Sequence, residues 1–183
     1  MTVTEKAKPR FTWVDVVEKT LAVGACLVFL GSIAFPFCRF MPYSNIRGVS
    51  GDHPYEFLWA YKLRTEYLLS THAPEEVWFG SYWFGQTTTR YDSLQSVLPL
   101  MLVVQVVTVA AAIASSVKRR KAWAFIPVAG CSITIALMAS TASALSTHST
   151  FHVDAYQTGY WLAFPSLALF IVGFLLTVKP KQR

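Results

Sequence analysis

The chain has 183 residues, of which 54% are hydrophobic and 14% are charged, and its mean hydropathy is +0.41. This composition is too apolar for an ordinary water-soluble domain of this size, so a membrane protein is expected. The formal net charge of +6 would indicate a nucleic-acid partner only if the basic residues lined one surface, and they do not.

Four segments approach the roughly 20 apolar residues that a helix needs to cross a hydrocarbon core of about 30 Å. They cover residues 20–37, 94–117, 122–145 and 160–178, and none contains Asp, Glu, Lys, Arg or His. The remaining segments are the N-terminus 1–19, a long loop 38–93, a turn 118–121, a second loop 146–159 and a tail 179–183. The sequence therefore predicts an all-α integral membrane protein, a four-transmembrane-helix bundle with a structured first outer loop.

The distribution of Lys and Arg predicts the orientation of these spans. Of the 16 Lys and Arg residues, eleven lie in the N-terminus, the 118–121 turn and the C-terminal tail. The long loop holds the other five, together with six acidic residues. We therefore expect a multi-pass protein with both termini on the cytoplasmic side. The basic balance reflects topology and contact with anionic lipid, and no nucleic-acid partner is expected.

The long loop is the most informative part of the chain, since a loop of this length usually has its own structure or task. Asp52 followed by Pro54 is typical of a helix start. Apolar residues at helical spacing then predict an amphipathic helix: Phe57, Leu58, Tyr61, Leu68 and Leu69. A second helix start is expected at 73–76, and the run 87–89 favours β-structure, so the loop is compatible with both.

An aromatic stretch at 78–85, WFGSYWFG, is too short to span a membrane. Aromatic side chains bury large areas with little loss of entropy, which makes them common at protein interfaces and in the lipid headgroup zone. Packing on the loop or on headgroups is one interpretation, and contact with a partner protein is the other. The candidate contact residues are Trp78, Phe79, Tyr82, Trp83 and Phe84.

The third span carries small residues at a spacing of four, which lets helix backbones approach closely in a membrane. These residues are Ser132, Ala136, Ser140 and Ala144. Packing inside the bundle is the first interpretation, and lateral contact with another subunit is the alternative.

Several short motifs resemble those of the claudin-like tetraspan superfamily. The first span ends in AFPFCR at 34–39, Trp78, Gly80 and Trp83 resemble the family's spaced Trp motif, and RYDSL at 90–94 leads into the second span. The family's two loop cysteines have no counterpart here, since no cysteine lies between Arg39 and Gly130. The resemblance implies a β-sheet in the first outer loop and a non-catalytic role in adhesion or in assembly with other membrane proteins.

A different class of function is indicated by two histidines four residues apart, His148 and His152, which are followed by Asp154. This spacing can place two imidazoles on one helix face, so a metal site completed by the long loop is an alternative. A quinone groove is a further alternative, whereas haem would need histidines within the spans, which have none.

The preferred prediction has no cofactor and no catalytic residue. It is a non-enzymatic four-span protein that associates with other membrane proteins and lipid, as an accessory or structural subunit of a membrane complex or as a claudin-like adhesion or auxiliary protein. The alternative is a subunit of a membrane enzyme or redox complex with an outer-face metal or quinone site near His148 and His152.

Overall fold

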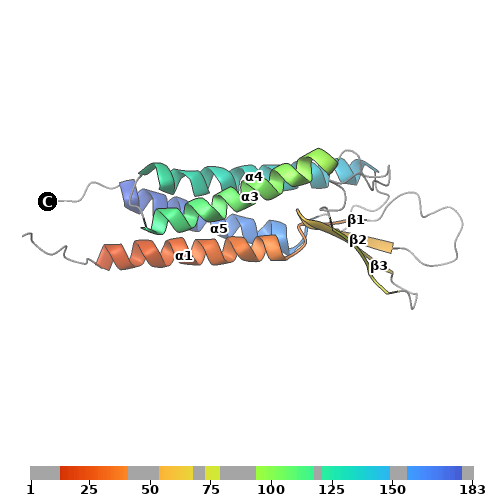
Figure 1. The fold of residues 1–183 in the computed structure, drawn as a ribbon, viewed down its shortest axis with the longest axis horizontal. Helices are drawn as coiled ribbons and strands as arrows, with labels where there is room; N and C mark the ends of the chain where they lie inside the picture. The colour runs from red at the N-terminus through yellow and green to blue at the C-terminus, as the bar shows by residue number, and fades with distance from the viewer. Residues whose placement is uncertain are drawn as a thin grey trace, which may run out of the picture.

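In the computed structural model, the described residues are 13–40, 54–67, 73–78, 94–117, 121–148 and 156–178. Within these ranges the chain forms four long helices and one four-stranded sheet (Figure 1). The helices are α1 (Trp13–Ala34), α3 (Leu94–Val117), α4 (Lys121–His148) and α5 (Thr158–Val178). They lie side by side, with the sheet at one end of the bundle. We call this the sheet end, and we call the opposite end, where α1 begins and α5 finishes, the terminal end.

All four helices are long and apolar enough to cross a membrane, which confirms the predicted four-span architecture. The apolar stretches have 19 to 23 residues. At a rise of about 1.5 Å per residue, such stretches match a hydrocarbon core of about 30 Å.

The predicted bounds differ from the observed helices mainly in the first span. The predicted second span and α3 coincide, at 94–117. By contrast, α1 begins at Trp13 and so includes charged residues of the predicted N-terminal segment, because a helix can continue into the interface beyond the hydrocarbon. It finishes at Ala34, since Pro36 disfavours helical geometry in the residue before it.

The long loop forms antiparallel strands, where the sequence predicted helices. The strands are β1 (Cys38–Phe40), β2 (Pro54–Leu58), β3 (Lys62–Tyr67) and β4 (Glu75–Trp78), in the order β1-β2-β3-β4. The helix expected after Asp52 and the helix start expected at 73–76 are therefore wrong. Burial alternates between buried and half-buried from Tyr55 to Leu58, as in a strand with one face against a core. The sequence was compatible with both helix and β-structure in this loop, and its described part is a β-sheet.

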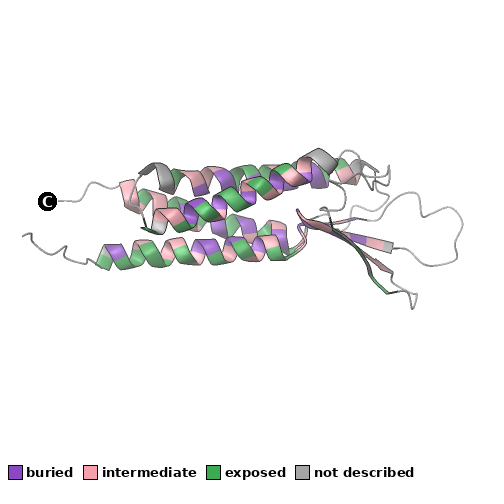
Figure 2. Ribbon diagram, in the orientation of Figure 1, coloured by how far each residue is buried: buried purple, intermediate pink, exposed green. Residues whose placement is uncertain are grey.

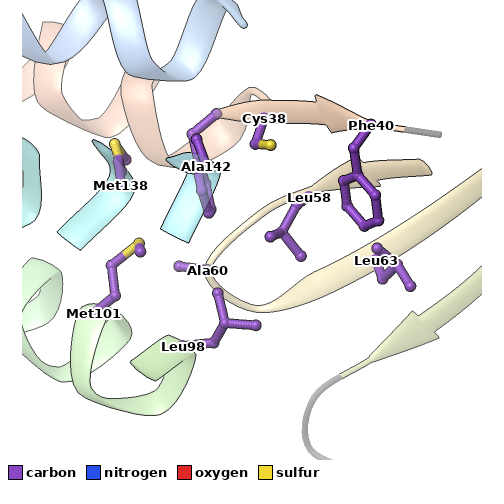
Figure 3. Close-up of a cluster of buried hydrophobic side chains, with 10 residues drawn as sticks. Cys38, Phe40, Leu58, Ala60, Leu63, Leu98, Met101, Met138 and Ala142 are labelled. Atoms are coloured by element: carbon purple, nitrogen blue, oxygen red, sulfur yellow. The ribbon is translucent and has the colours of Figure 1, made fainter. Parts of the chain in front are cut away.

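One face of the sheet packs against the ends of α3 and α4. Leu58 and Leu63 pair directly across β2 and β3, and both side chains are buried. They join a cluster that includes Leu98 and Met101 from α3 and Met138 from α4 (Figure 3). Burial of these apolar side chains holds the sheet on the bundle.

Hydrogen bonds fasten the sheet to α1 and α5. The Phe37 N–H donates to the Leu58 carbonyl at 2.9 Å, and the Trp59 indole donates to the Ala34 carbonyl at 2.9 Å. On the α5 side, the Gln157 N–H donates to the Phe37 carbonyl at 3.0 Å. The sheet is thus joined by directional bonds to the ends of two spans.

A second apolar cluster lies toward the terminal end, formed by Ala25, Cys26, Phe29, Ala112, Cys131 and Phe170. Along each helix, buried polar residues separate it from the cluster at the sheet end. These are Ser32, Gln105, Thr108, Thr134 and Ser166. The Ser and Thr hydroxyls each donate to a carbonyl of their own helix at 2.7 to 2.9 Å. Both polar side-chain atoms of Gln105 are buried without a hydrogen-bond partner among the described residues.

Candidate functional site

The sheet has a second face, directed away from the bundle, which we call the ladder face. Because directly opposite residues of antiparallel strands point to the same side, the strand register assigns its members. Register partners on this side are Arg39, Phe57, Arg64 and Glu76 in one row, Tyr55 and Glu66 in a second row, and Lys62 and Trp78 in a third. Figure 2 shows the contrast between buried and more exposed positions along the strands. The face mixes aromatic rings with charges of both signs.

Lys62 is the centre of the most closely packed part of this face. Its Nζ lies 3.0 Å from Glu76 Oε1, 4.6 Å from the centre of the Trp59 ring and 5.3 Å from the centre of the Trp78 ring. The side chain is only 15% exposed. One ammonium group thus contacts a carboxylate and two indoles, and each cation–π contact is worth about 0.5–2 kcal/mol. These contacts fix the relative position of β3, β4 and the turn between β2 and β3.

Trp78 is held in place by its neighbours and yet remains exposed. Its ring centre is 5.7 Å from that of Tyr61, and 54% of the residue is exposed. It lies on β4, a strand at the edge of the sheet. An exposed, positioned tryptophan loses little entropy on binding, which suits an anchor at an interface.

Ion pairs extend the ladder face beyond Lys62. Arg64 Nε lies 2.9 Å from Glu66 Oε1, in an ion pair too bent for a hydrogen bond, and Arg64 Nη1 lies 4.0 Å from Glu76 Oε1. Arg39 lies over the Tyr55 ring at 5.0 Å. Half-exposed pairs of this kind add little stability, about 0–1 kcal/mol each. Their charges are better suited to selecting and orienting a partner.

Of the five aromatic residues predicted as partner contacts, the structure describes Trp78. Phe79, Tyr82, Trp83 and Phe84 lie outside the described residues, so their role stays a prediction. Sequence reasoning did not identify Trp59 or Lys62. The signal that could have found them is the pair of strand-like segments 54–58 and 62–67, separated by a three-residue turn.

The small residues of the third span do not pack inside the bundle, so that interpretation is wrong. Ser132, Ala136, Ser140 and Ala144 are all exposed. The inward face of α4 is formed instead by Cys131, Thr134, Met138, Thr141 and Ala142. In a membrane span both faces are apolar, so hydropathy does not identify the inward one. Lateral contact through the exposed row stays a prediction.

The predicted metal site falls mostly outside the described residues. His148 is the last residue of α4, but its side chain is not described, and His152 and Asp154 lie beyond the described range. Within the part of the chain that the structure describes, no group of three or more His, Cys, Asp or Glu side chains could hold a metal ion. The metal and quinone alternatives are therefore untested.

Cys38 is the first residue of β1, and its side chain is buried in the apolar cluster between the sheet and the helices. Burial raises the pKa of its thiol from 9.0 to about 12, because a thiolate would be desolvated there. The thiol therefore stays protonated at neutral pH. In this state it is a packing group and a poor nucleophile.

No protein-family model matches the chain, and no characterised protein matches it in sequence.

Proposed function

We propose that this protein is a non-enzymatic four-span membrane protein that acts by binding another membrane protein through the ladder face. It would work as an accessory or structural subunit, or as a claudin-like adhesion or auxiliary protein. In either role both termini lie on the cytoplasmic side and the ladder face on the outer side, as the distribution of basic residues predicts.

The observation that supports this proposal best is the exposed Trp78, supported by Tyr61 and Lys62 on a sheet fastened to the bundle. Interfaces are typically anchored by a few tryptophan, tyrosine and arginine side chains surrounded by polar groups. The ladder face has this composition, with Arg64 and Glu76 beside the aromatic centre. It is also preorganised, which lowers the entropy that association costs.

The test is recovery of partner proteins with tagged variants solubilised in mild detergent. Trp78→Ala removes the anchor, and we expect recovery of the specific partner to fall about tenfold, as for an interface residue worth 1–2 kcal/mol. Trp13→Ala is the matched control, because Trp13 is 82% exposed but lies at the terminal end. This control should leave recovery unchanged.

Equal recovery of partners by wild type and Trp78→Ala would contradict the proposal. The enzymatic alternative has its own readout, a stoichiometric metal that a chelator removes from the purified protein and that His148→Ala loses. At present no observation within the described residues favours that alternative, since the side chains it needs lie outside them.

A further inference from the structure

A cavity that the ladder face does not use lies at the seam between α1 and α3. Its volume is about 130 Å³. The described residues that line it are all apolar: Ala22, Val23, Cys26, Leu27, Ala112 and Ile113. Apolar cavities of about 150 Å³ in other proteins stay dry and bind benzene. The α1–α3 cavity is therefore large enough for a single apolar molecule of about six carbon atoms.

The sizes of the lining residues explain why the two helices leave this space. Cys26 and Ala112 are buried at its base, where their short side chains fill little of the seam. Val23 and Ile113 lie at its mouth and are 53% and 57% exposed. β-Branched side chains have one strongly preferred rotamer in a helix, so these two do not swing inward to fill the space. The cavity thus exists before a ligand arrives, which lowers the entropy that binding costs.

The cavity lies at the depth of the hydrocarbon, which restricts its ligand to uncharged molecules. Its α1 residues fall within the apolar stretch Asp15–Ala34, and its α3 residues fall within Val97–Ser115. The exposed residues at its mouth face the lipid side of the bundle, so a ligand dissolved in the membrane can enter directly. Among the described lining residues there is no charge to compensate a polar group for its lost hydration.

The height of the cavity favours a compact molecule over a lipid chain. On α1 its lining runs from Ala22 to Leu27, about 7.5 Å at the helical rise, and on α3 it covers two adjacent residues. A lipid chain, by contrast, runs through one leaflet, about half of a hydrocarbon core of about 30 Å. Only a short piece of such a chain fits, and fixing it there costs conformational entropy that a rigid ring does not lose.

We propose that the α1–α3 cavity binds one compact, uncharged, apolar molecule of about six carbon atoms, taken up from the membrane. The driving force is van der Waals contact with cavity walls that would otherwise border a void. The site does not depend on the ladder face, so it can be tested without the partner protein. Cyclohexane is a suitable probe, and n-hexane is its matched comparison, because it has the same number of carbon atoms in a flexible chain.

Two substitutions fill the cavity from different positions. Ala22→Leu and Cys26→Leu each enlarge the side chain of a lining residue, and the two residues lie about one helical turn apart on α1. Ala110→Leu is the matched control. Ala110 is an exposed alanine of α3 that does not line the cavity, so this variant adds a leucine to a span without filling the space.

The experiment is thermal unfolding of the purified full chain in mild detergent, with cyclohexane or n-hexane at equal mole fractions in the micelles. At about ten times its Kd, we expect cyclohexane to raise the wild-type midpoint by about 3–6 °C. The same amount of n-hexane should raise it by less than about 1 °C. Ala110→Leu should retain the cyclohexane shift, and both filling variants should lose it.

Three results would overturn the proposal. If cyclohexane does not raise the wild-type midpoint, the cavity binds no such molecule. An equal shift with n-hexane would mean that a flexible chain occupies the cavity as well as a ring does. A full cyclohexane shift in both filling variants would place the bound molecule elsewhere. The unfolding transition of each variant without a probe verifies that it is folded, and the comparison of the two probes on the wild type needs no variant.

Discussion

Gln105 is 1% exposed near the middle of α3, and neither atom of its amide group has a hydrogen-bond partner among the described residues. A buried polar group left unpaired costs about 1–3 kcal/mol, and a membrane offers no bulk water to satisfy it. Thr108 and Thr134, which are also buried, avoid this cost because their hydroxyls donate to carbonyls of their own helices. Among the described residues of the bundle, the unpaired amide of Gln105 therefore lowers the stability of the fold.

Replacing this amide with an apolar side chain of similar length should stabilise the protein. We expect Gln105→Met to raise the free energy of unfolding by about 1–3 kcal/mol, measured as a higher thermal midpoint in detergent. Thr134→Val is the matched control and should change it by less than about 1 kcal/mol, since only a hydroxyl bonded within its own helix is lost. A lower midpoint for Gln105→Met would mean that the amide has a partner in the membrane.

At the scale of elements, the end of α1 and the start of α5 meet at Gly159. A Cβ there would collide with the Phe35 carbonyl oxygen and would lie 2.8 Å from the Ser32 oxygen and 2.9 Å from the Pro36 oxygen. The Gly159 N–H also donates to the Pro36 carbonyl at 2.9 Å, so the backbones cannot separate without losing this bond. The contact between these two elements thus depends on the absence of a side chain.

Gly159→Ala should accordingly destabilise the fold by about 1–3 kcal/mol, the usual cost of overpacking. Gly24→Ala should stabilise it by about 0.5–1 kcal/mol, because alanine is the better helix former and the site has space. The two thermal midpoints, measured side by side, should move in opposite directions. If both rise, the α1–α5 contact is looser than the structure indicates.

The elements also show what the sequence could and could not predict. The four spans were predictable because hydropathy is a property of each segment by itself. Strands β2 and β3 were not, because Phe57, Leu58 and Tyr61 fit a helical spacing as well as a strand. The burial of Leu58 against α3 and α4 decides between them, and this is a long-range contact. Trp78 could be singled out as a candidate from the aromatic composition of its own segment. Its proximity to Lys62 could not be predicted, because it depends on the long-range pairing of β3 with β4.

At the scale of the whole molecule, the sheet and the ends of the described chain lie at opposite ends of the bundle (Figure 1). The orientation of one end therefore fixes that of the other. Cysteine labelling suits this arrangement, because the three native cysteines are buried. Cys38 lies outside the spans, and burial raises its pKa to about 12, so it stays protonated during labelling at neutral pH.

We predict that a membrane-impermeant maleimide labels Ala73→Cys in intact cells and labels Trp13→Cys only after permeabilisation. Both positions are exposed and lie at the sheet end and the terminal end, respectively. Labelling of both variants in intact cells would contradict the placement of the terminal end and the sheet end on opposite sides of the membrane. The reverse pattern would keep the spans and invert the orientation that the basic residues predict.

The way the sheet is attached has a mechanical consequence. Backbone hydrogen bonds link Gln157 to Phe37 and Gly159 to Pro36, and a β-bridge pairs Cys38 with Tyr156. The contact with α3 and α4, by comparison, is a layer of non-directional apolar packing that includes Leu98 and Met138. A load on the sheet is thus carried by the first and last spans as one unit, while the two middle spans offer a surface over which the sheet can shear.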